Sequence, residues 1–253
     1  AEDGIRDRRK SLVGSEMCIR DRPKIGLSFA SGLRSFLRQD PDVIMVGEIR
    51  DHETAEIAIH ASLTGHLVLS TLHTNDAPSA ITRLVDMDVQ AYQISSSVMG
   101  VLAQRLVRRL CEQCKTPYTP TDQDLLELDI DAATAQEKLA ELKRVAATTV
   151  LGSGTSILPE PAAGESDELT FYHPGGCDAC SNTGYRGRIG IFELMLIDEP
   201  VRREILNNSD AKTIQRVAQQ QGMRLLREDG ARQVLAGVTS VEEVLAATQA
   251  AEV

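Results

Sequence analysis

The stretch from Leu37 to Asp51 constrains the fold of this chain most strongly. It contains the apolar, β-branched-rich run Val43-Ile44-Met45-Val46, with Asp40-Pro41-Asp42 before it and Gly47 after it. Such a run predicts a short strand that is buried on both faces of a parallel sheet. In open α/β sheets ligands bind at the carboxyl ends of the strands, so the carboxylate of Glu48, just past this strand, is a candidate functional group.

A second buried strand is expected at 66–71, and the residues between the two strands are helix formers. Asp51 is a candidate N-cap for that helix, and Gly65 is a natural stop. Together these elements predict one parallel, right-handed strand–helix–strand crossover. His73 follows the second strand, so we expect it at the same sheet edge as Glu48. Spacing alone is equally compatible with a His73 that only bonds a loop carbonyl.

Periodicity and capping residues predict the remaining elements. They are a short helix at 29–37, a helix capped by Asn75 or Asp76, a longer helix at 91–110, an acidic helix or pair of helices at 124–145, a flexible loop at 152–167, a strand at 190–195, and then short helices, the last with a capping box that starts at Thr239 or Ser240.

Composition excludes several classes of function. The net charge of -10 argues against a general nucleic-acid-binding surface, and the absence of Trp with only 3% aromatic residues argues against a stacking platform for single strands. The negative charge is concentrated between Lys115 and Thr170, a stretch that contains 11 acidic and 4 basic residues. No apolar run approaches the ~18 residues that a membrane span needs, so we expect membrane association only through a partner protein.

The first 22 residues differ from the rest of the chain. Ile5-Arg6-Asp7-Arg8 recurs as Ile19-Arg20-Asp21-Arg22, and neither copy has an apolar period. This stretch resembles translated library-adapter sequence, so we interpret residues 1–22, with Cys18, as a non-native leader. A disordered basic arm is the alternative interpretation.

The other four cysteines form two C-x-x-C pairs, Cys111 with Cys114 and Cys177 with Cys180. Four thiolates satisfy a tetrahedral zinc ion and leave no open coordination position, so the pairs predict a closed, structural Zn²⁺ site. A labile disulfide or a cluster without metal are the alternatives. Cysteine pairs of this kind favour a reducing compartment over a secreted location.

Two strings resemble the secretion ATPases of type II secretion and type IV pilus assembly: LRQDPDVIMVGEIRD at 37–51 and TGHLVLSTLHTND at 64–76. The resemblance implies that the first strand is a Walker B element with Glu48 as its catalytic carboxylate. It also implies that His73 is the phosphate-sensing residue of the His box, and that Gly47 lies where many P-loop enzymes place a magnesium-binding Asp. The implied cofactors are ATP, Mg²⁺ and a structural Zn²⁺.

The same resemblance extends to the cysteines, which match the tetracysteine module of these ATPases. The strings at 101–111 and 184–194 are more similar to the type II secretion branch than to the pilus branch. The expected fold is α/β, a partial RecA-like parallel sheet with a tetracysteine zinc module and a C-terminal helical subdomain. The expected ranges are 1–22 for the leader, 23–110 for the ATPase core, 111–190 for the metal-binding module with its acidic insert, and 191–253 for the helical subdomain.

No G-x-x-x-x-G-K-[ST] loop, which would hold the phosphates, occurs in the 253 residues. We therefore expect this chain to be the C-terminal part of an ATPase and to be inactive alone. The whole protein would be an ATP-hydrolysing motor that powers type II secretion by pseudopilus assembly. The resemblance implies a homo-hexamer at the cytoplasmic face of the inner membrane, with inner-membrane platform proteins as partners and no nucleic acid. The alternatives are a pilus-assembly ATPase or a non-catalytic zinc-binding scaffold or adaptor.

Overall fold

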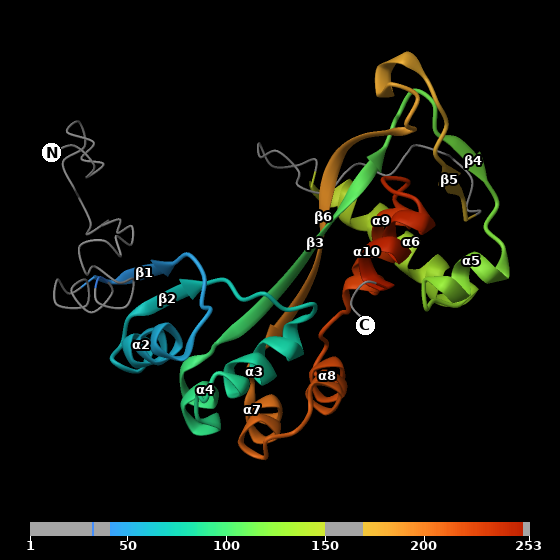
Figure 1. Ribbon diagram of the computed structural model, residues 1–253. Helices are drawn as coiled ribbons and strands as arrows, with labels where there is room; N and C mark the ends of the chain where they lie inside the picture. The colour runs from blue at the N-terminus through green and yellow to red at the C-terminus, as the bar shows by residue number, and fades with distance from the viewer. Residues whose placement is uncertain (1–31, 33–40, 150–168, 250–253) are drawn as a thin grey trace, which may run out of the picture. The chain divides into compact units, whose positions relative to one another are not determined.

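The computed structural model describes residue 32 and residues 41–149 and 169–249 (Figure 1). The predicted leader, the helix expected at 29–37 apart from Gly32, and the loop expected at 152–167 lie outside these residues. The described chain forms two compact units, and the domain ranges expected from the sequence stay a prediction. Of the described residues, unit 1 holds those up to Thr74, Pro78–Val101 and Leu196–Ala218, and unit 2 holds those of Asn75–Ala77, Leu102–Met195 and from Gln219 onward.

Unit 1 contains the predicted crossover. Strand β1 (Val43–Val46) pairs in parallel with β2 (Leu67–Ser70), with Val43 opposite Leu67, and helix α2 (His52–Leu63) connects them. Asp51 caps α2, because its Oδ1 accepts the Thr54 amide at 2.8 Å. Gly65 follows the helix end with φ +104, a conformation that glycine adopts without strain. The local reasoning from capping residues is confirmed here.

The expectation that β1 and β2 are buried on both faces is wrong for the described chain. In β1, Ile44 and Val46 are buried, whereas Val43 and Met45 are 53% and 79% exposed. In β2, Leu67 and Leu69 are also exposed. The physical reason is that these strands form a two-stranded sheet, so the described residues cover one face only. An apolar run indicates that both faces of a strand can be buried, but it does not show which other elements bury them.

Further helices lie wholly or mostly in unit 1. Helix α3 (Ala77–Asp86) begins directly after Asp76 and carries Pro78 in its first turn, where a missing N–H costs nothing. Helix α4 (Ala91–Ser97) packs against both α2 and α7 (Glu199–Leu206), and α8 (Ala211–Gln220) follows α7 in the chain.

The prediction of a longer helix at 91–110 is wrong, because α4 ends at Ser97 and strand β3 (Gly100–Leu110) follows. Alternate residues of β3 face inward, from Val101 to the buried Val107, while Leu102 and Leu106 are exposed. The string VLAQRLVRRL consists largely of good helix formers, which is why the helix was expected. Pairing of β3 with β6 (Tyr185–Leu196) overrides that local preference.

Unit 2 contains this β3–β6 pair, which runs side by side in Figure 1, and a second pair. Strand β4 (Thr116–Tyr118) is antiparallel to β5 (Phe171–His173), and the acidic stretch forms two helices, α5 (Asp122–Glu127) and α6 (Ala132–Thr149). A short 3-10 helix, η2 (Asp178–Cys180), precedes β6, and α9 (Leu226–Leu235) and α10 (Val241–Gln249) close the described chain. A shared apolar core includes Leu128, Phe171, Val234 and Val244.

Helix α10 begins at one of the two capping positions expected from the sequence. The Glu243 amide donates to Ser240 Oγ at 3.4 Å, and the Glu243 carboxylate accepts the amide and the Nε–H of Arg108, each at 2.9 Å. The Glu243 carboxylate therefore ties α10 to β3. Within the described ranges, none of the helices combines the length and the apolar character that crossing a bilayer requires.

Candidate functional site

The first candidate site lies where β1 and β2 end. His73 Nε2 is 2.9 Å from Glu48 Oε2, although the two residues are 25 positions apart in the chain. The parallel ladder continues past β1, because the Ile49 amide donates to Thr71 O at 3.0 Å and Thr71 Oγ1 donates to Gly47 O at 2.7 Å. The structure thus brings together at one sheet edge the acid and the imidazole that the sequence singled out, with Gly47 beside them.

Arg50 is part of this cluster, and sequence reasoning missed that. Its Nη2 lies 2.6 Å from Glu48 Oε1. The signal was available in the spacing: residues two positions apart in an extended segment project to the same side. The bond from Arg50, and then the bond from His73, lower the pKa of Glu48 below its ordinary value near 4.5. Glu48 is therefore ionised at neutral pH.

The contact with Glu48 limits what His73 can do at one time. A neutral imidazole carries one N–H, and Nε2 faces the carboxylate. To donate to a phosphate oxygen as well, the ring needs a second proton or must leave Glu48. Both groups are reachable, since the side chains of Glu48 and His73 are 34% and 82% exposed. The pair can therefore exchange its internal bond for bonds to a polar ligand.

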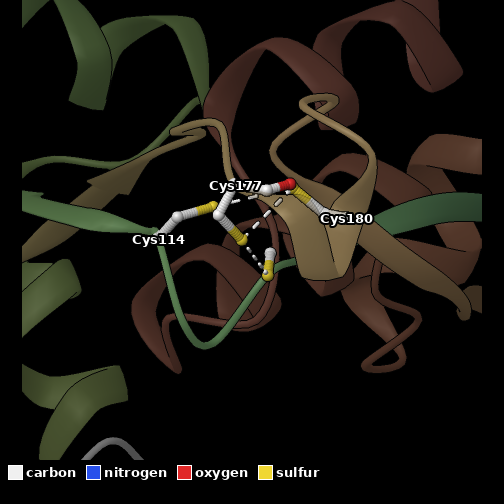
Figure 2. A group of neighbouring side chains, drawn as sticks. Cys114, Cys177 and Cys180 are labelled. Atoms are coloured by element: carbon white, nitrogen blue, oxygen red, sulfur yellow. Dashed lines mark hydrogen bonds between the residues drawn. The ribbon is translucent and has the colours of Figure 1, made fainter.

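The second candidate site is the cysteine cluster of unit 2. Figure 2 shows Cys114, Cys177 and Cys180 directed toward one another, and with Cys111 they place four Sγ atoms within 4.8 Å of one another. The printed contacts are 3.8 Å for Cys111–Cys177, 3.8 Å for Cys114–Cys180 and 3.7 Å for Cys177–Cys180. All four thiols are free, so the disulfide alternative does not describe this arrangement.

These distances fit a tetrahedral metal. Zn–S bonds of about 2.3 Å require sulfur atoms about 3.8 Å apart in a tetrahedron. Burial raises the pKa of Cys114 to about 12, and contacts with the other three thiols add to the rise. For Cys180, burial opposes ionisation, but bonds that include the Gly184 amide at 3.2 Å lower the pKa to about 6. Thiols this close cannot all ionise without a cation, so the donor set suits Zn²⁺.

Two glycines allow the two halves of the cluster to approach. The Cys111 amide donates to Gly184 O at 2.9 Å, which joins the first pair to the second. Gly184 has φ +75, and a Cβ there would lie 2.6 Å from Gly175 O. A Cβ at Gly175 would collide with the carbonyl of Cys114. Side chains at either position would push the pairs apart, and a sequence scan for C-x-x-C alone does not reveal this requirement.

Comparison with known proteins identifies relatives of this chain. The chain is 46% identical over 226 residues to the type IV pilus assembly ATPase PilB of Thermus thermophilus, which covers 89% of this chain and 22% of that protein. It is 48% identical over 226 residues to the type II secretion system protein E of Pseudomonas aeruginosa, covering 89% of this chain and 38% of that protein. The chain thus spans between about a fifth and two fifths of the length of these relatives.

Solved structures show the same fold. The pilus retraction motor PilT with bound ADP has a TM-score of 0.52 and 25% sequence identity, over 87% of this chain and 43% of that one. The ATPase DotB of Yersinia pseudotuberculosis has a TM-score of 0.55 at 17% identity, over 93% of this chain and 44% of that one, which supports the fold alone. The expected fold class, mixed α/β with a tetracysteine cluster, is confirmed.

A family profile gives the broadest match. The family described as "Type II/IV secretion system protein" matches residues 2–246, a range that reaches into the stretch 1–22, whose interpretation as a leader stays a prediction. The curated relatives named above are ATPases or proteins of secretion and pilus-assembly systems, which confirms the resemblance drawn from the sequence. This chain belongs to the type II/IV secretion system protein family.

Proposed function

We propose that the whole protein is an ATP-hydrolysing motor subunit that powers type II secretion by assembling a pseudopilus. The observation that carries the proposal is the 2.9 Å contact between Glu48 and His73 at the shared end of two parallel strands, in a chain of this family. Type IV pilus assembly is the second candidate, because identity to the pilus ATPase of Thermus thermophilus, 46%, is close to the 48% with the type II protein of Pseudomonas aeruginosa.

In this proposal Glu48 is the catalytic carboxylate. Its pKa, lowered by Arg50 and His73, keeps it ionised so that it can orient and deprotonate a water near a terminal phosphate. Its two oxygens have lone pairs beyond those used by Arg50 and His73, so a water can bind without breaking either contact. His73 exchanges its bond to Glu48 for a bond to the terminal phosphate of ATP, so its position depends on whether that phosphate is bound.

The proposed cofactors are ATP, Mg²⁺ and Zn²⁺. Gly47 leaves room beside Glu48, since a Cβ there would meet nothing within 4 Å. When bound, Mg²⁺ would neutralise charge on the phosphates. Zn²⁺ would be held by Cys111, Cys114, Cys177 and Cys180 as a structural ion.

The assembly and location of the whole protein belong to the same proposal. We expect a homo-hexamer at the cytoplasmic face of the inner membrane, where it acts on platform proteins. Because these 253 residues contain no G-x-x-x-x-G-K-[ST] loop, we expect the chain alone neither to bind nor to hydrolyse ATP.

The test uses a longer chain of the same gene that includes such a loop. Glu48→Gln should lower kcat for ATP hydrolysis by about 10²–10⁴-fold, because Gln cannot accept a proton, while ATP still binds. Steady-state turnover and nucleotide titration measure the two effects. Glu56→Gln is the matched control, because Glu56 is an exposed acid of α2 and should leave turnover unchanged.

Three results would overturn the proposal. Unchanged turnover in the Glu48→Gln chain would remove Glu48 from catalysis. Absence of a phosphate-binding loop in the upstream reading frame, or no ATP hydrolysis by the longer chain, would favour the zinc-binding scaffold. Micromolar ATP binding by the 253-residue chain alone would contradict the expectation that it is inactive.

A further inference from the structure

The turn that leads into α10, residues 237–240 of unit 2, is bonded to residues that flank the cysteine pairs. Its two hydroxyl side chains are buried, with Thr239 0% and Ser240 1% exposed, so each needs a hydrogen-bond partner inside the protein. Thr239 Oγ1 donates to Arg108 O at 2.8 Å, and Ser240 Oγ lies 2.9 Å from the hydroxyl of Tyr185. Arg108 precedes the first cysteine pair and Tyr185 follows the second, so the partners come from both sides of the cluster.

The other two residues of the turn are bonded through their carbonyl oxygens. Val238 O accepts the amide of Leu110 at 2.8 Å, and Gly237 O accepts Lys115 Nζ at 3.0 Å. Leu110 directly precedes the first cysteine pair, and Lys115 directly follows it. Every residue of the turn therefore has a bond to a segment that also carries cysteine ligands.

Lys115 links the first cysteine pair to the turn. Its amide donates to Cys111 O at 3.0 Å, so the conformation of the pair sets where this side chain begins. The side chain is 10% exposed, and its ammonium lies 2.7 Å from Glu112 Oε2 and 4.7 Å from the ring centroid of Tyr172. Gly237 has φ +68, and a Cβ there would lie 2.8 Å from Tyr172 Cε2. The ammonium and the turn are therefore packed against the same ring.

A metal ion at the four thiols would fix both cysteine pairs together. Cys111 and Cys177 are 66 positions apart in the chain, and their Sγ atoms lie 3.8 Å apart. Without a cation, ionised thiols at this distance repel one another, and neutral thiols form weak hydrogen bonds. Metal binding therefore stabilises the arrangement of both flanking segments, and with it their bonds to the turn.

We propose that the attachment of α10 depends on metal at the cysteine cluster, and that Lys115 and Tyr185 couple the cluster to the turn 237–240. When the metal is lost, the turn and the start of α10 detach. Val241 and Val244 of α10 are buried in the apolar core that includes residues of α5 and α9, so detachment exposes apolar surface. This coupling rests on the proposed Zn²⁺ and does not depend on ATP hydrolysis.

Hydrogen exchange of the 253-residue chain, with zinc and after its removal by a chelator, tests the coupling. The amides of Val238, in the turn, and Val244, in the first turn of α10, should exchange at least about tenfold faster without zinc. The Ala135 amide of α6 is the internal reference, because it bonds within its own helix, and it should change by less than about twofold.

Lys115→Met tests the link while all four cysteines stay in place. With saturating zinc, it should speed exchange of Val238 and Val244 by about three- to tenfold, because the buried bond to Gly237 O is lost. Glu112→Gln is the matched control. It changes the exposed partner of the same ammonium but leaves the bond to the turn, so both amides should exchange as in the parent.

Zinc affinity gives a second, independent measurement. Coupling between two events is reciprocal, so a turn that zinc stabilises must in turn favour zinc binding. Lys115→Met should therefore weaken zinc binding by about three- to tenfold, and Glu112→Gln should leave it unchanged. Competition with a chromophoric chelator measures both dissociation constants.

The outcomes separate the coupling from the metal site itself. If the chain binds no zinc, the proposed cofactor and the coupling both fail, whereas the motor function tested with Glu48→Gln is untouched. If zinc binds but its removal leaves the exchange of Val238 and Val244 unchanged, or speeds that of Ala135 equally, the coupling alone is overturned.

The variants decide in the same way. Unchanged exchange and unchanged zinc affinity in Lys115→Met overturn the coupling, and so does an equal effect of Glu112→Gln. If Lys115→Met does not fold, Tyr185→Phe replaces it, because this change removes the hydroxyl that bonds Ser240. Faster exchange of the turn with weaker zinc binding in Tyr185→Phe supports the coupling, and no change in either overturns it.

Discussion

At the scale of single residues, Arg108 joins three parts of unit 2. Its guanidinium lies 4.0 Å from the ring centroid of Tyr185, and its Nε donates to Glu243 at 2.9 Å. Tyr185 in turn bonds Ser240, the cap of α10, at 2.9 Å. Burial opposes ionisation of Glu243, but the bonds from Arg108 outweigh it and lower the pKa of Glu243. This group of side chains makes the attachment of α10 sensitive to acid.

Glu243→Gln should lower the free energy of unfolding by about 1–2 kcal/mol at pH 7, since a charge-assisted bond is lost on a partly exposed surface. A lowered pKa stabilises the folded state above the ordinary value near 4.5. That contribution is lost as pH falls through the folded-state pKa. Denaturant unfolding at pH 7 and again below pH 4 measures the difference, which should shrink in acid.

Glu242→Gln is the control for this prediction, because Glu242 is the exposed neighbour of Glu243 on α10. It should leave stability within about 0.5 kcal/mol of the parent at both pH values. An equal loss in both variants, or a difference that grows in acid, would contradict the role given to the Arg108–Glu243 contact.

Sequence reasoning at this scale succeeded where backbone geometry fixes a side chain. Asp51 was recognisable as a cap, and the meeting of Glu48 and His73 follows from the common edge of parallel strands. The buried Glu193 of β6 was not recognisable as an acceptor, because an acid within a strand usually faces solvent, and its partners are backbone amides of two distant helices. A sequence pattern shows which side chains are polar or apolar. It does not show which backbone amides at helix N-termini need an acceptor from elsewhere in the chain.

At the scale of elements, the turn around Gly184 decides whether the two cysteine pairs can meet. Gly184→Ala should disrupt the metal site, because the added Cβ meets Gly175 O and the φ of +75 is strained for alanine. We expect a loss of about 2–3 kcal/mol together with weaker zinc binding. Unfolding curves and zinc competition with a chromophoric chelator measure the two effects.

Gly187→Ala is the matched control for the turn. Gly187 has a similar φ of +81, but a Cβ there would meet nothing within 4 Å. It should cost only the backbone strain, about 1 kcal/mol, and leave zinc affinity unchanged. If both variants bind zinc equally well, close approach at Gly184 is not required.

The incorrect prediction of a helix where β3 lies also concerns the scale of elements. Helix propensity is a property of neighbouring residues, whereas a strand is completed by a partner that lies far away in the chain, here β6. The crossover of β1, α2 and β2 was predictable because its turns, caps and apolar runs are all local. Elements were thus predictable where local signals agreed, and not where a distant pairing overrode them.

At the scale of the whole molecule, the cysteine cluster should add stability when metal is bound. We expect one zinc ion per chain and a gain of about 4 kcal/mol when free zinc exceeds its dissociation constant a thousandfold. Elemental analysis and unfolding with and without a chelator check this. Cys177→Ser should abolish both effects, while Cys18→Ser, at the cysteine outside the two pairs, should abolish neither.

The interleaving of the two units has a consequence for synthesis on the ribosome. Helix α4 ends at Ser97, but its packing partner α7 begins only at Glu199. At about 5–20 residues per second, α4 waits roughly 5–20 s for that partner to be translated. During this interval the part of α4 that packs against α7 has no partner, although α2 is already present. Translation pauses and chaperone supply should therefore affect the yield of this protein more than the yield of a protein whose packing partners are close in sequence.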